Sequence, residues 1–91
     1  MQILETPISE VVTIDPKERY PGDWRVIKGL TQPQLAAAAR IATTTPRGIE
    51  GADLALTDAN AATLARLLGI GIDEYRAAHQ RARERPAGTP V

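Results

Sequence analysis

Hydrophobic positions at helical spacing mark the second half of the chain. One predicted helix face consists of Ala61, Leu64, Ala65 and Leu68, which follow one another at i, i+3, i+4 and i+7. Thr57 precedes this run as a capping residue and Gly69 follows it, so a helix is predicted between them. A further helix is expected to begin near Ile72 and to continue to Arg85, because Pro86 cannot extend it.

Shorter helical patterns precede these two. The run 16–23 contains two prolines and a glycine, and Asp23 at its end is expected to cap a helix that reaches Lys28. Thr31 has the side chain of a capping residue, so the next helix is predicted to start after it, with Pro33 in its first turn.

This second helix is rich in alanine. Leu35, Ala38 and Ala39 are expected to share one buried face. Ala36 beside them is small enough to let two helices cross closely. The pattern then shifts at residues 40–42, which predicts a sharp change of direction.

A third short helix is predicted to start within residues 43–45 and to run to about Glu50. Proline beyond the first turn of a helix costs about 3 kcal/mol or more. We therefore expect Thr44 or Thr45 to act as the cap, which leaves Pro46 in the first turn.

The first fifteen residues follow a different pattern. Ile8, Val12 and Ile14 fall at even spacing on one side of an extended chain, which predicts an arm or short strand; a loosely ordered terminus is the alternative. The predicted fold class is all-α, with five helices and this extended arm. The predicted parts of the chain are an arm and linker at 1–22, a helical domain at 23–85 and a disordered tail at 86–91.

Composition agrees with one small helical domain. The chain has 91 residues without phenylalanine, so its core must be aliphatic and rich in alanine. There is no cysteine for a disulfide or a thiolate metal site. Neither a membrane span nor a signal peptide is expected, and the protein is predicted to be cytoplasmic. Abundant alanine, arginine and glycine indicate a GC-rich bacterial or phage genome.

Charge counts against nucleic-acid binding if only the sum is considered. Eleven basic and eleven acidic residues give a net charge of zero. Between residues 30 and 75, three arginines face five carboxylates, whereas residues 76–91 hold four arginines and one glutamate. The basic end either contacts phosphates or forms a solvated helix face.

Residues 30–51 read LTQPQLAAAARIATTTPRGIEG, with Gln32 and Ala36 four apart and Ile41 after the break. This register resembles the helix-turn-helix of the Cro/CI-like (XRE-type) bacterial and phage regulators. The resemblance covers about residues 24–75. It continues through Ile49–Glu50, Leu64–Ala65, Leu68–Gly69 and Ile72–Tyr75.

The resemblance implies a sequence-specific DNA-binding transcriptional regulator, repressor-like, that reads a two-fold operator as a homodimer. In such proteins the second helix of the pair lies in the major groove of double-stranded DNA. The residues expected to contact DNA are Lys28, Gln32, Arg40, Thr43, Thr44, Thr45 and Arg47. Alternatively, the threonines only cap a helix, Arg47 is solvated, and Lys28 interacts with a helix dipole.

Three residues depart from the usual pattern of these regulators. Pro46 and Gly48 disfavour the predicted reading helix, and arginine stands at position 40, where glycine is common. With the acidic balance, Pro46 and Gly48 favour a protein-binding regulator on the same fold, such as an antitoxin or antiactivator that sequesters a partner.

Catalysis has no support in the sequence. His79 is the only histidine and has no companion ligand at metal-binding spacing, so a packing or surface role is expected. Asp73 and Glu74 are adjacent on a helix and point apart, so they are not an acid/base pair. We expect no enzyme activity, no cofactor and no metal.

Overall fold

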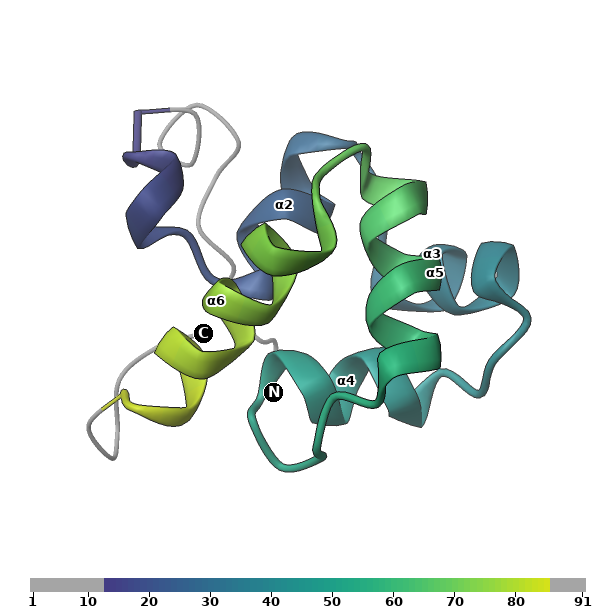
Figure 1. Ribbon diagram of the computed structural model, residues 1–91. Helices are drawn as coiled ribbons and strands as arrows, with labels where there is room; N and C mark the ends of the chain where they lie inside the picture. The colour runs from purple at the N-terminus through teal and green to yellow at the C-terminus, as the bar shows by residue number, and fades with distance from the viewer. Residues whose placement is uncertain (1–12, 86–91) are drawn as a thin grey trace, which may run out of the picture.

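Helices account for the regular structure in residues 13–85, the part of the chain that the computed structural model describes (Figure 1). In chain order the elements are a 3-10 helix η1 (Pro16–Glu18) and the α-helices α2 (Pro21–Ile27), α3 (Gln32–Ala39), α4 (Thr44–Glu50), α5 (Asp58–Leu68) and α6 (Ile72–Arg83). No strand occurs among these residues, so the all-α prediction is confirmed for them. Residues 1–12, which make up most of the predicted strand or arm, and the tail at 86–91 lie outside the described residues.

Local capping signals explain where α3 and α5 begin and end. The hydroxyl of Thr31 accepts a hydrogen bond from the Gln34 backbone N–H at 3.2 Å, and the hydroxyl of Thr57 accepts one from Asn60 N–H at 3.2 Å. Each bond satisfies a backbone donor that the helix leaves without a partner. Gly69 ends α5 with φ 73°, a left-handed conformation that glycine adopts without steric cost.

Helix α2 begins earlier than predicted. Tyr20 is the residue before its first turn, and Pro21 starts the helix because its fixed φ suits that position. Asp23 is therefore not the cap, since its carboxylate lies in the first turn and accepts the Tyr20 backbone N–H at 2.8 Å. The predicted linker also contains η1, whose first turn is capped by Asp15.

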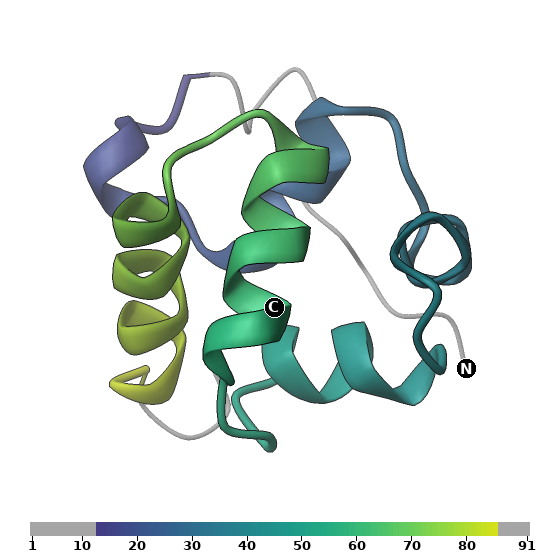
Figure 2. The same cartoon turned by 45° about the vertical axis from the view of Figure 1, so that its right-hand side comes forward.

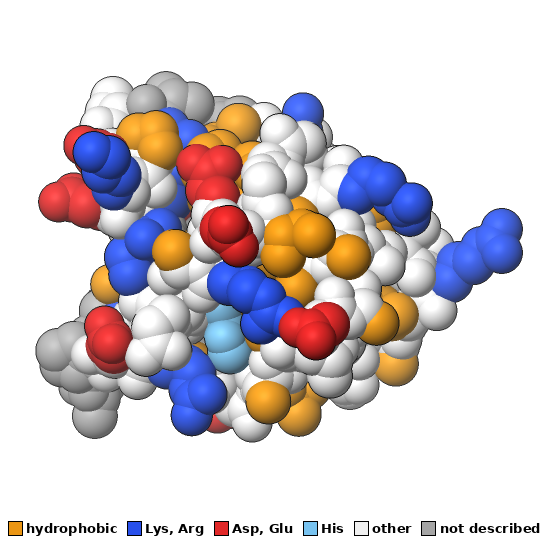
Figure 3. Space-filling view, in the orientation of Figure 1, with side chains coloured by type: hydrophobic (Ala, Val, Ile, Leu, Met, Phe, Trp, Pro, Cys, Tyr) orange, Lys and Arg blue, Asp and Glu red, His pale blue; other side chains and the backbone are white. Residues whose placement is uncertain are grey.

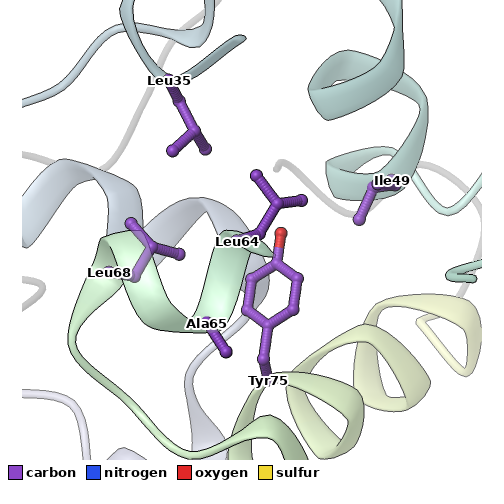
Figure 4. Close-up of a cluster of buried hydrophobic side chains, with 6 residues drawn as sticks. All are labelled: Leu35, Ile49, Leu64, Ala65, Leu68 and Tyr75. Carbon is purple, nitrogen blue, oxygen red and sulfur yellow. The ribbon is translucent and has the colours of Figure 1, made fainter. Parts of the chain in front are cut away.

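The hydrophobic core lies between α3, α4, α5 and α6. Its fully buried cluster consists of Leu35, Ile49, Leu64, Ala65, Leu68 and Tyr75 (Figure 4). Helix α5 packs against α6 on one side and α3 on the other (Figure 2). Ala36 is buried, as the close crossing requires, but Ala38 is exposed, so its predicted place on the buried face was wrong. The buried residues of α3 are Leu35 and Ala36, and Ala39 is half-buried.

Arginines near the end of α6 fasten the segment before α2. The Arg81 guanidinium donates to the Arg19 carbonyl from Nε at 2.9 Å and from a terminal nitrogen at 2.6 Å. Arg85 stacks over the Tyr20 ring at 4.7 Å and donates to the Glu50 carbonyl at 3.3 Å. The basic end of the chain is therefore not a uniformly solvated face, because these arginines hold separate segments together. Within residues 13–85, no helix is long and apolar enough to cross a membrane.

Candidate nucleic-acid interface

The turn between α3 and α4 is closed by Arg40 in the left-handed conformation, with φ 57° and ψ 42°. The Ile41 N–H donates to the Ala36 carbonyl at 3.0 Å, and the Arg40 N–H donates to Ala37 at 3.2 Å. These two bonds form the helix ending that usually contains glycine. Arginine thus adopts the glycine geometry, and the chain keeps a sharp turn despite the steric cost.

Helix α4 starts at Thr44, so Thr44 and Thr45 are its first residues, and the prediction that one of them caps it was wrong. Thr43 precedes the helix with helical φ and ψ and makes no capping bond through its side chain. Pro46 is the third residue of the helix, as predicted within the first turn. An N–H there has no partner inside the helix, so proline removes nothing that α4 needs.

One side of α4 is exposed and the other is buried. Thr43, Thr44 and Arg47 are exposed, and Thr45 is half-buried. The opposite side, which is buried, consists of Pro46, Gly48, Ile49 and Glu50. The structure thus presents a short polar surface with one arginine, supported from behind by close packing.

The remaining predicted contact residues lie in different surroundings. Arg40 is exposed at the turn. Gln32 is half-buried, and its amide nitrogen donates to Glu50 Oε1 at 3.1 Å. Lys28 is exposed but lies over the end of α5, because its Nζ is 3.3 Å from where a Cβ at Gly69 would stand.

A buried ion pair that the sequence did not reveal holds the end of α4. Arg25 on α2 donates to both carboxylate oxygens of Glu50, at 2.8 and 3.0 Å, and to the Leu30 carbonyl at 2.7 Å. The two residues are 2% and 6% exposed. Gly22 makes this approach possible, since a Cβ there would lie 2.9 Å from Glu50 Oε1. With Gln32, the pair links α2, α3 and α4.

Tyr75 lies in the core close to this ion pair. Its burial, and secondly the charge of Glu50, raise the pKa of the Tyr75 phenol well above its ordinary value, while Arg25 acts in the opposite direction. The phenol is therefore neutral throughout the physiological pH range.

The loop after α4 braces the helix through Gly48. The Gly48 carbonyl accepts N–H bonds from Asp53 at 2.7 Å and Leu54 at 3.1 Å. A Cβ at position 48 would lie 2.5 Å from Leu54 Cγ, so glycine allows the loop to cross α4 closely. His79 is buried and donates from Nε2 to the Leu54 carbonyl at 3.0 Å, which confirms its packing role. Among the described residues, no cluster of histidine and carboxylate side chains is able to hold a metal.

Ion pairing removes the acidic excess counted between residues 30 and 75. Glu50 pairs with Arg25 and Asp58 with Arg76, and both arginines lie outside that range. Three of the five carboxylates then remain against three arginines. At the right-hand edge of Figure 3, over α3 and α5, basic side chains are exposed and no acidic side chain is in view.

No protein-family model, curated protein or solved structure matches this chain. Sequence pattern and geometry are therefore what support an assignment of function.

Proposed function

We propose that the protein is a sequence-specific DNA-binding transcriptional regulator of the Cro/CI-like type, repressor-like, which binds a two-fold operator as a homodimer. Helix α4 enters the major groove and α3 lies behind it. The observation that carries the proposal is the exposed side of α4, with Thr43, Thr44 and Arg47 projecting from a helix whose opposite side is buried.

Each exposed side chain has a chemical role in this arrangement. Arg47 makes the paired hydrogen bonds that guanine accepts at its major-groove edge. Thr43 and Thr44 donate to phosphate oxygens or contact a thymine methyl group. Arg40 at the turn binds a phosphate, and Gln32 offers its second amide hydrogen to another, since the first is held by Glu50.

The observations that favoured a protein-binding regulator have structural explanations. Pro46 occupies the first turn of α4, where its missing N–H is harmless. Gly48 serves the close approach of Leu54. The acidic excess disappears when Glu50 and Asp58 pair with arginines. None of these features requires a protein partner in place of DNA.

Selection of bound duplexes from a random pool tests the proposal, with wild-type protein and an Arg47→Ala variant run in parallel. We expect the wild type to enrich a two-fold symmetric sequence and the variant to lose preference at one position in each half. If neither protein enriches a sequence and wild-type protein does not bind duplex DNA at low salt, the proposal is wrong. A stable complex with another protein under those conditions would establish the partner-binding alternative.

A further inference from the structure

The turn between α5 and α6 exposes hydrophobic surface that no described part of the chain covers. Ile72 at the start of α6 is 46% exposed, and only Leu54 is comparable among large hydrophobic residues of the described chain. Leu67 and Ile70, which precede it in the chain, are half-buried and pack against the core. Most isolated exposed side chains need no explanation, so the surroundings of Ile72 decide whether this one has a role.

Gly71, the residue before the first turn of α6, leaves the backbone of this turn without a side chain. Its φ of −70° suits any residue, and no atom lies within 4 Å of the position that a Cβ would occupy. By contrast, Gly29 and Gly69 adopt positive φ, and Gly48 is crowded by Leu54. Glycine is among the residues preferred before a helix, although it has no side-chain oxygen to cap it. Because position 71 carries no side chain, a second surface can approach the backbone of the turn closely.

Charges of opposite sign border the turn on its two sides. Lys28 and Arg66 are exposed near the end of α5, and Asp73 and Glu74 are exposed in the first turn of α6. In the upper half of Figure 3, acidic side chains lie over the start of α6 and basic ones lie to the right over α5, with hydrophobic surface between them. A two-fold axis through such a turn places each acidic side against the basic side of the other copy.

We propose that this turn, residues 69–72, is the contact surface between two copies of the chain. Ile72 of each copy packs against the turn of the other, and Gly71 allows the backbones to approach. Arg66 faces the carboxylates of Asp73 and Glu74 across the axis. The inference deepens the proposed function, which requires two copies on DNA. The outer side of α6 further along is less suitable, because Gln80, Arg83 and Glu84 make it polar.

Sedimentation equilibrium without DNA tests this surface through Ile72→Glu, with Ala59→Glu as the control, because Ala59 is exposed at the other end of α5. We expect the wild type and the control to dimerise alike, and Ile72→Glu to weaken the dimer about tenfold or more, the effect of losing one central contact. Gly71→Leu should weaken it similarly while keeping its helical circular dichroism, since position 71 is open in the single chain. A monomeric wild type, or equal effects of Ile72→Glu and Ala59→Glu, would overturn the proposal.

Charge reversal distinguishes a self-complementary contact from capture of an unrelated protein. Arg66→Glu should weaken the dimer, and adding Glu74→Arg should restore it. Failure of the restoration contradicts the two-fold arrangement. Because no DNA is present, a negative result rules out only the contact between copies at residues 69–72. The duplex selection tests the proposed DNA-binding function separately.

Discussion

The ion pair between Arg25 and Glu50 provides the strongest stability prediction. Glu50→Ala removes two charge-assisted hydrogen bonds from a guanidinium that is 2% exposed, and one acceptor from Gln32. Arg25 then keeps its bond to the Leu30 carbonyl but loses both of its bonds to the Glu50 carboxylate. Removing one partner of a buried ion pair costs about 3–5 kcal/mol. That is a large part of the roughly 5–15 kcal/mol by which small domains are stable.

Urea unfolding followed by Trp24 fluorescence and by circular dichroism measures this loss. If the free energy of unfolding falls by about 1–2 kcal/mol per molar urea, the urea concentration at the unfolding midpoint should fall by about 2 M or more. Asp58→Ala is the matched control, because it removes the carboxylate of an exposed pair with Arg76 and should leave the midpoint almost unchanged. Replacing both buried partners, Arg25→Met with Glu50→Leu, should recover most of the loss. If Glu50→Ala unfolds at the same urea concentration as Asp58→Ala, the reasoning is refuted.

Three further predictions concern packing, pH and DNA. Gly48→Ala should lower the free energy of unfolding by about 1–3 kcal/mol, because the added Cβ overpacks against Leu54 even though alanine is the better helix former. Adding Leu54→Ala should relieve this loss. Unchanged thermal stability of the single variant would contradict the proposed contact between the loop and α4. The raised pKa of Tyr75 favours the neutral phenol in the folded state. Stability should therefore be intact below about pH 10 and fall above it, and Tyr75→Phe should flatten that fall in unfolding titrations. Arg47→Ala should weaken binding to a selected duplex by about 1–3 kcal/mol in a mobility-shift titration, whereas equal weakening by Arg83→Ala on α6 would remove the specific role of Arg47.

Predictable parts of the fold depend on local chemistry. Thr31 and Thr57 cap helices through their own hydroxyls, and Gly69 ends one through its own φ, so three residues define these boundaries without tertiary information. The start of α2 was missed because Asp23 suits two positions, the cap and the first turn. Only the bond from Tyr20 to its carboxylate distinguishes them.

The less predictable features depend on residues far apart in the sequence. Arg25 and Glu50 are separated by 25 positions, so neither shows its partner in the sequence. Gly48 counts as a helix penalty until Leu54 is placed against it. For the candidate interface, the exposure of Thr43, Thr44 and Arg47 follows the predicted register of α4, but the bond from Gln32 to Glu50 required tertiary contacts.

Salt dependence of binding to a selected duplex tests the DNA-binding proposal most directly, with wild type compared with Arg40→Gly. Glycine at position 40 removes the charge and suits the left-handed turn, so the variant should be as stable as the wild type or more so by about 1 kcal/mol. If Arg40 of each copy binds a phosphate, these two charges should contribute about −2 to the slope of the logarithm of the association constant against the logarithm of salt. Arg40→Gly should remove this contribution and make the slope less steep by about two. A slope near zero for the wild type, or the same slope for both proteins, would contradict the proposed placement of this turn on DNA.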